Sequence, residues 1–140
     1  MDQPHAPLKV FLVDDSIPVR QRVAQMLRDS DIEVVGEAAA PKAAIEGILA
    51  SKPQAVVLDI QLNGGTGLDV LRAVRLAAPQ IVFVVLSNNS GPAYRKLYRI
   101  EGAAHFLDKN AEFDQLVQTI FKCHTQARSN PNAQSPGEKQ

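Results

Sequence analysis

The sequence predicts a doubly wound α/β domain with a parallel sheet. Five short apolar runs begin at residues 8, 32, 55, 81 and 104, which gives intervals of 24, 23, 26 and 23 residues. Each interval has room for one strand, one helix and two short loops. Apolar residues recur at helical spacing between the runs. Alternating strands and helices imply a parallel sheet that is covered by helices on both faces.

The five predicted strands differ in how apolar they are. Residues 8–13, 55–58 and 81–86 consist almost entirely of Val, Leu, Ile, Phe and Ala. Such runs are typical of strands that are covered on both faces. Residues 32–38 and 104–107 include glutamates or a histidine. We therefore expect these two strands at the edges of the sheet.

A helical pattern follows each predicted strand. Ser16 is a suitable N-cap for the first helix, and Pro41 begins the second. The third helix ends before Pro79, and the fourth covers about residues 92–101. The clearest pattern lies in residues 113–121, where apolar side chains recur at i, i+3, i+4, i+7 and i+8. The sequence therefore predicts five helices.

Composition excludes several classes of protein. The 140 residues contain 15 Lys and Arg and 15 Asp and Glu, so the net charge is zero and gives no basis for nucleic-acid binding. The single cysteine, Cys123, cannot form an internal disulfide. We find neither a signal peptide nor the ~20 apolar residues of a membrane span. We expect a soluble cytoplasmic domain over residues 8–124, followed by a disordered polar tail or linker over residues 125–140.

Polar residues of the right kind for phosphoryl chemistry follow four of the predicted strands. They are Asp14, Asp15, Asp59, Ser87 and Lys109. Ligands of open α/β sheets bind at the carboxyl ends of the strands, so these side chains should meet at one edge. Clustered carboxylates favour a hard cation such as Mg²⁺. A carboxylate can also act as a nucleophile towards phosphorus.

Each of these residues also has an ordinary explanation. The aspartates could be solvated loop or capping residues, the serine a helix cap, and the lysine a surface cation. Taken one at a time, these explanations are the better ones. The joint occurrence of five such residues at four strand ends favours a functional site.

The motifs resemble those of the receiver domain of bacterial two-component response regulators. They are VDDS at 13–16, VLD at 57–59, LS at 86–87 and FLDK at 106–109. The resemblance extends over about residues 8–124. It implies a flavodoxin-like fold, with the sheet order 2-1-3-4-5. It also implies a phosphorylation-dependent switch in a phosphorelay, and no enzymatic activity beyond its own phosphoryl transfer and autodephosphorylation.

The resemblance assigns a role to each acidic residue. Asp59 would accept a phosphoryl group from a histidine kinase or phosphotransfer protein. Asp15, Asp59 and the backbone carbonyl of Gln61 would hold Mg²⁺, with Asp14 acting mostly through a water molecule. Lys109 would pair with Asp59 before modification and with the phosphoryl group afterwards.

Further residues would control the switch and the lifetime of the phosphoryl group. Ser87 would bond a phosphoryl oxygen, and Phe106 would follow it from an outward to an inward rotamer. A plain core role for Phe106 is an equal alternative. Gln61, Asn88 and Asn89 occupy positions that tune hydrolysis in the family. We expect slow to intermediate autodephosphorylation.

The chain departs from the family pattern at two prolines and one small residue. Asn63 and Asn110 stand where prolines are usual, and Asn88 stands where Ala is common. The two proline changes do not touch the phosphoryl chemistry. The larger side chain of Asn88 could narrow the access to Asp59.

The fourth predicted helix is the expected surface for a downstream partner or for a second copy of the chain. Its apolar spacing predicts that Leu97 and Ile100 face inward. Tyrosine and arginine are enriched at protein interfaces, so we expect the partner surface to include four residues of this helix: Tyr94, Arg95, Tyr98 and Arg99. We expect no partner among nucleic acids or membranes.

A haloacid-dehalogenase-like phosphatase is the alternative reading. It also uses an aspartyl nucleophile on a parallel sheet, and VVLSNN at 84–89 resembles its second motif. Its nucleophile, however, follows the first strand in an Asp-x-Asp pattern, and here position 16 is Ser16. A phosphoryl group on Asp59 would favour the receiver domain, and one on Asp14 would favour the phosphatase. A scaffold that is never phosphorylated is a weaker third reading, because clustered carboxylates repel one another.

Overall fold

Five parallel strands form the central sheet. The structure is a computed structural model that describes residues 7–129, with the side chains described as far as residue 124. The strands are β1 (Lys9–Val13), β2 (Glu33–Ala38), β3 (Ala55–Leu58), β6 (Val82–Ser87) and β7 (His105–Asp108). Their spatial order is β2-β1-β3-β6-β7, which confirms the predicted order and the two predicted edge strands.

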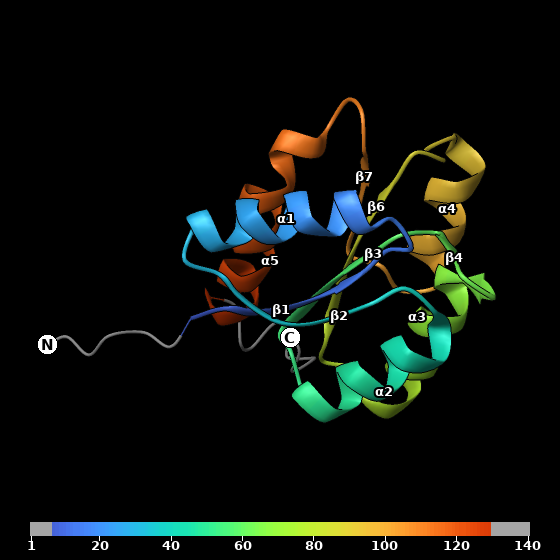
Figure 1. The fold of residues 1–140 in the computed structure, drawn as a ribbon, viewed down its shortest axis with the longest axis horizontal. Helices are drawn as coiled ribbons and strands as arrows, with labels where there is room; N and C mark the ends of the chain where they lie inside the picture. The colour runs from blue at the N-terminus through green and yellow to red at the C-terminus, as the bar shows by residue number, and fades with distance from the viewer. Residues whose placement is uncertain (1–6, 130–140) are drawn as a thin grey trace, which may run out of the picture.

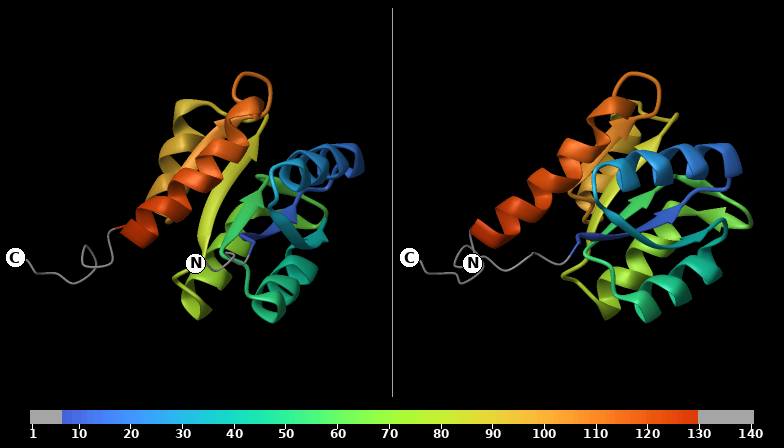
Figure 2. Two further views of the ribbon diagram at one scale, coloured as in Figure 1. Left: turned by 90° about the vertical axis from the view of Figure 1, so that its left-hand side faces the viewer. Right: turned by 60° about the vertical axis from the view of Figure 1, so that its left-hand side comes forward.

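Five α-helices cover the two faces of the sheet. They are α1 (Ile17–Asp29), α2 (Pro41–Ser51), α3 (Gly67–Ala77), α4 (Pro92–Ile100) and α5 (Leu116–Ser129), the last preceded by a 3-10 helix, η1 (Phe113–Gln115). Helices α1 and α5 lie on one face, and α2, α3 and α4 lie on the other (Figures 1 and 2). Each face has its own hydrophobic core, so the central strands are apolar on both sides. The predicted fold class is confirmed.

A small hairpin was not predicted. Strands β4 (Gln61–Leu62) and β5 (Gly65–Thr66) pair antiparallel between β3 and α3. Gly64, at the turn, has a φ of 79°, a conformation that favours glycine. Strands of two residues are too short to produce a periodic pattern in the sequence.

Helix α4 presents a different face to the core from the one that its aliphatic spacing predicts. Ile100 is 67% exposed and Leu97 is also exposed, whereas Tyr98 is only 1% exposed. The Tyr98 ring packs edge-on against Phe106, with ring centroids 6.0 Å apart, and belongs to the core between the sheet and helices α2, α3 and α4. The prediction for Leu97 and Ile100 is wrong because the long aromatic side chain of Tyr98 fills this site.

The end of α5 also differs from the prediction. Phe121, expected to face inward, is exposed. The helix continues to Ser129, so residues 125–129 of the predicted tail are helical. The rest of that tail lies outside the described residues. Over residues 7–129, none of the helices has the length and apolar character needed to cross a bilayer.

The orientation of α4 can be tested by truncating its two tyrosines. We expect Tyr98→Ala to lower the free energy of unfolding by about 3 kcal/mol or more, since it empties a packed core site. Tyr94→Ala, on the 43% exposed tyrosine of the same helix, should cost well under ~1 kcal/mol. Urea denaturation of both variants measures the difference. Equal losses would contradict this orientation of α4.

Candidate functional site

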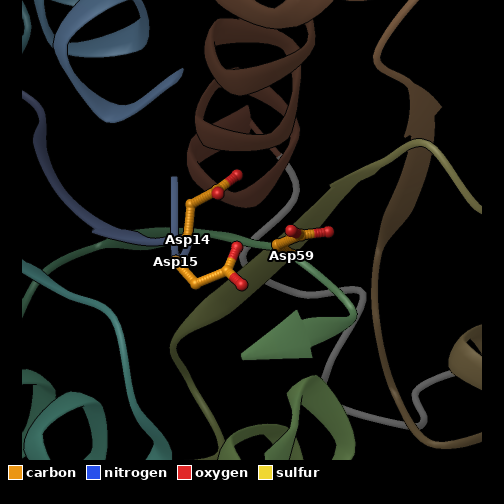
Figure 3. Close-up of side chains that lie close together, drawn as sticks. All are labelled: Asp14, Asp15 and Asp59. Atoms are coloured by element: carbon orange, nitrogen blue, oxygen red, sulfur yellow. The ribbon is translucent and has the colours of Figure 1, made fainter. Parts of the chain in front are cut away.

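Three carboxylates meet at the carboxyl edge of the sheet. Asp14 and Asp15 follow β1 directly, and Asp59 follows β3. One oxygen of each lies within 4.8 Å of the others, and Figure 3 shows the three side chains gathered at the ends of the two strands. Asp14 and Asp59 are buried, whereas Asp15 is exposed. The three predicted acidic residues, Asp14, Asp15 and Asp59, thus form one group, which we call the acidic cluster.

Lys109 provides an ammonium group to the acidic cluster from the end of β7. Its Nζ lies 2.8 Å from Asp14 Oδ2 and 3.2 Å from Asp59 Oδ2. Burial and the neighbouring Asp14 raise the pKa of Asp59, and the pairing with Lys109 offsets this only in part. Burial alone would lower the pKa of Lys109, but its bonds to both carboxylates raise it. Lys109 therefore stays protonated at neutral pH and has two carboxylates to neutralise.

Backbone groups fix the positions of the two buried carboxylates. Asp59 Oδ1 accepts a hydrogen bond from the Ile60 N–H (2.7 Å), and Asp14 Oδ1 accepts one from the Ser16 N–H (2.8 Å). Arg20 Nη1 donates to the backbone carbonyl of Asp14 at 2.6 Å. Arg20 cannot be identified as a site residue from the sequence, because no sequence pattern marks a contact between a side chain and a backbone carbonyl.

Gly67 lets α3 begin directly beside the end of β3. Its N–H donates to the Ile60 carbonyl at 2.7 Å. A Cβ at this position would lie 2.4 Å from the backbone oxygen of Asp59. A side chain here would therefore displace the segment that carries Asp59.

Ser87 completes the site at the end of β6. Its side chain is buried, and Oγ accepts a hydrogen bond from the Asn89 N–H at 3.1 Å. The hydroxyl proton therefore stays available for donation to a ligand. The Ser87 carbonyl accepts the Lys109 N–H at 3.0 Å, so β6 and β7 hold these two residues together.

The other predicted site residues surround this centre. Gln61 and Asn88 are exposed, and Asn89 and Phe106 are half-buried. Their roles in metal binding, lifetime and switching stay predictions. Tyr98 cannot belong to a partner surface, because it is buried against α3 and β7. That part of the prediction is wrong.

The acidic cluster fits a divalent cation of the hard type. Three carboxylates offer oxygen atoms close enough to share one ion, and oxygen is the donor that Mg²⁺ prefers. Burial, and after it the charge of Asp14, raise the pKa of Asp59, and a bound cation would favour the ionised form of both acids. A pocket of about 470 Å³ opens at the opposite, amino-terminal edge of the sheet, lined by Leu8, Ala55 and Ile81 among others. It is remote from the acidic cluster.

The fold and the site define the chain as a doubly wound α/β domain with three carboxylates and a lysine at the carboxyl edge of its sheet. Comparison with known families makes this specific. The chain belongs to the family of response regulator receiver domains, whose sequence model matches residues 10–121. Receiver domains of this family are phosphorylation-dependent switch modules of bacterial two-component phosphorelays.

Individual relatives agree with this assignment. The DNA-binding transcriptional activator DevR/DosR of Mycobacterium tuberculosis is 28% identical over 114 residues, which cover 81% of this chain and 52% of the relative. A protein-glutamate methylesterase/protein-glutamine glutaminase of Idiomarina loihiensis is 34% identical over 120 residues, or 81% of this chain and 31% of the relative. The chain thus spans about half or less of these proteins.

A solved structure extends the likeness to three dimensions. The signal receiver domain of the putative response regulator NarL of Mycobacterium tuberculosis superimposes with a TM-score of 0.78 and 30% identity. The match covers 84% of this chain and 95% of that domain. The flavodoxin-like receiver fold is therefore shared.

The raised pKa of Asp59 predicts a dependence of stability on pH. A carboxyl whose pKa is raised by folding favours the folded state below its ordinary pKa of 3.8, and this contribution is lost as pH rises through the folded value. We expect Asp59→Asn, which stays neutral, to be more stable than the wild type near neutral pH. The difference should shrink towards about pH 4. Urea denaturation from about pH 4 to about pH 8 measures it.

Two controls accompany this measurement. Asp114→Asn, on an exposed acid, should not reproduce the effect. Mg²⁺ should stabilise the wild type more than Asp59→Asn, because it neutralises the acidic cluster. A wild type that is more stable than Asp59→Asn at neutral pH without Mg²⁺ would show that pairing with Lys109 outweighs burial and repulsion.

Proposed function

We propose that this receiver domain accepts a phosphoryl group on Asp59 from the phosphohistidine of a histidine kinase or phosphotransfer protein. One observation supports a phosphoryl acceptor at this edge above other functions. Asp59 is a buried carboxylate that contacts the Lys109 ammonium at 3.2 Å and has two further carboxylates beside it. Asp14 makes matching contacts with the Ser16 N–H and Lys109, so the choice between the two buried acids rests on the VLD motif at 57–59, which ends in Asp59.

The transfer needs positioning and charge neutralisation more than covalent chemistry. A carboxylate oxygen of Asp59 forms a bond to phosphorus while the bond between phosphorus and the histidine nitrogen breaks, and the nitrogen retains that electron pair. Lys109, already at the carboxylate, donates to an oxygen of the incoming group. Ser87 has a free hydroxyl proton for a second oxygen.

The acidic cluster would hold Mg²⁺ through Asp15, Asp59 and the backbone carbonyl of Gln61, with Asp14 acting through a water molecule. When bound, the ion neutralises charge on the transferring group. The exposed position of Asp15 suits a ligand that exchanges with solvent. The two buried acids are held by backbone amides and need little rearrangement to bind an ion.

The proposed output is a change of surface that is recognised by a downstream protein or a second copy of the chain. Ser87 and Phe106 would carry the change from Asp59 towards α4. Four of the exposed residues of α4 form the proposed surface for recognition: Tyr94, Leu97, Arg99 and Ile100. They replace the surface that included Tyr98. One relative is a DNA-binding activator, but this chain covers only 52% of it, and we propose a protein partner for the described domain.

The phosphatase alternative receives no support from the matched family or its relatives. The VVLSNN segment at 84–89, which resembles a phosphatase motif, forms the end of β6 and the first two residues of the loop after it. The activity proposed here is limited to the chain's own phosphorylation and dephosphorylation.

Acetyl phosphate tests the acceptor assignment. With Mg²⁺ we expect a single phosphoryl group on Asp59, detected by intact-mass and peptide mass spectrometry, because this carboxylate has Lys109 and Ser87 beside it. Asp59→Asn should lose the label completely, and Asp114→Asn should retain it. A label on Asp14 would instead support the phosphatase mechanism, and no label on either acid would reject both.

The lifetime of the phosphoryl group is the second expected property. Gln61, Asn88 and Asn89 correspond to positions that tune hydrolysis in the family, and we propose that amide side chains there obstruct the attacking water. Hydrolysis should therefore be slow to intermediate, over minutes or longer. We expect Asn89→Ala to accelerate it severalfold, whereas Asn63→Ala, on an exposed hairpin residue, should not. The decay of phosphorylated protein, followed by mass spectrometry, measures both rates. Complete hydrolysis of the wild type within seconds would contradict the proposal.

A further inference from the structure

Arg95 of α4 joins three segments that are separate in the sequence. Its Nε donates to the Ser90 carbonyl, its Nη1 to the Phe106 carbonyl and its Nη2 to Glu112 Oε1, each at 2.9 Å. The guanidinium carbon also lies 5.2 Å from the centre of the Phe106 ring, within the range of a cation–π contact. A planar guanidinium is suited to such a fork of contacts, which a lysine could not reproduce.

A second set of hydrogen bonds closes this arrangement into a ring. Glu112 Oε1 also accepts the Asp108 N–H at 2.8 Å, and the Asp108 carboxylate accepts the Ser90 hydroxyl. The other oxygen of Asp108 accepts the N–H groups of Asn110 (2.7 Å) and Ala111 (2.8 Å). We call Ser90, Arg95, Phe106, Asp108 and Glu112 the Arg95 clamp.

The Arg95 clamp lies next in the chain to two residues of the proposed phosphorylation site, Ser87 with its hydroxyl and Lys109 with its ammonium group. Ser90 belongs to the loop that begins after Ser87, and Asp108 directly precedes Lys109. The clamp is present in a chain whose Asp59 is a free carboxylate paired with Lys109. Tyr98 contacts the Phe106 ring edge-on and Arg95 contacts its face, so two residues of α4 hold this side chain.

We infer that Arg95 is a positioning residue that stabilises the unmodified arrangement of the loop after β6 and of Phe106, and so opposes activation. The inference rests on the proposed function. A ligand shifts a conformational equilibrium only through contacts that differ between the two states. Contacts that favour the unmodified state reduce the competent fraction and weaken the apparent affinity for a phosphoryl group or its mimic. Removing the clamp should therefore strengthen that affinity.

The decisive comparison is between Arg95→Gln and Lys96→Gln, two changes that each remove one positive charge from the same helix. The probe is beryllofluoride with Mg²⁺, a mimic of the phosphoryl group. Because the chain has no tryptophan, binding is followed by NMR through the amide signals of Ser87 and Lys109. We expect Arg95→Gln to tighten binding about threefold or more while it lowers the urea midpoint. Lys96→Gln, on an exposed residue, should change neither.

The opposite signs of the two effects separate positioning from support of the fold. A residue that only supports the fold would lower stability and leave binding unchanged or weaker, and that outcome for Arg95→Gln would overturn the inference. Glu112→Gln removes the charge of one acceptor and leaves the bonds of Arg95 to the Ser90 and Phe106 carbonyls, so it should act in the same direction but less strongly. If Arg95→Gln does not fold, Glu112→Gln tests the inference through the same two measurements. Failure of the wild type to bind the mimic or to label Asp59 would instead reject the proposed function.

Discussion

Two buried carboxylates, Asp14 and Asp59, share the single ammonium group of Lys109, and the organisation of the carboxyl edge follows from this shortage of positive charge. Burial and mutual repulsion raise the pKa of Asp59 even with the lysine in contact. The exposed Asp15 adds a third carboxylate. A divalent cation and an anionic group that arrive together would satisfy both the acids and the lysine. This explains why an arrangement costly to the fold suits phosphoryl transfer.

The sheet makes this arrangement possible because parallel strands end at one edge. Strands β1, β3, β6 and β7 bring the acids, Ser87 and Lys109 together, although they lie far apart in the chain. Backbone amides then fix the carboxylates, and the absence of a side chain at Gly67 lets α3 begin next to Asp59. These side chains are therefore positioned by the central sheet and by backbone hydrogen bonds.

Helix α4 is the element for which sequence periodicity was least informative. Its leucine and isoleucine marked one face, but the core takes Tyr98, and Ile100 faces solvent. Arg95 looked like part of a charged surface, yet it contacts backbone carbonyls of two other segments and the ring of Phe106. Both errors have the same origin, because amphipathic side chains can be buried by their apolar part and bonded at their polar end.

The sequence by itself determined the fold class, the strand order through its family motifs, the two edge strands and the five polar residues that meet at the carboxyl edge of the sheet. These follow from the composition of the strands and from what comes after each strand, which are local properties of the chain. Only the tertiary structure decided the side of α4 that is buried, the contact of Arg20 with the Asp14 carbonyl and the ring of bonds around Arg95. Such contacts depend on the distance and direction between elements that sequence periodicity does not encode. The inferred role of Arg95 depends on these contacts, whereas the proposed phosphoryl transfer depends on the residues that the motifs identify.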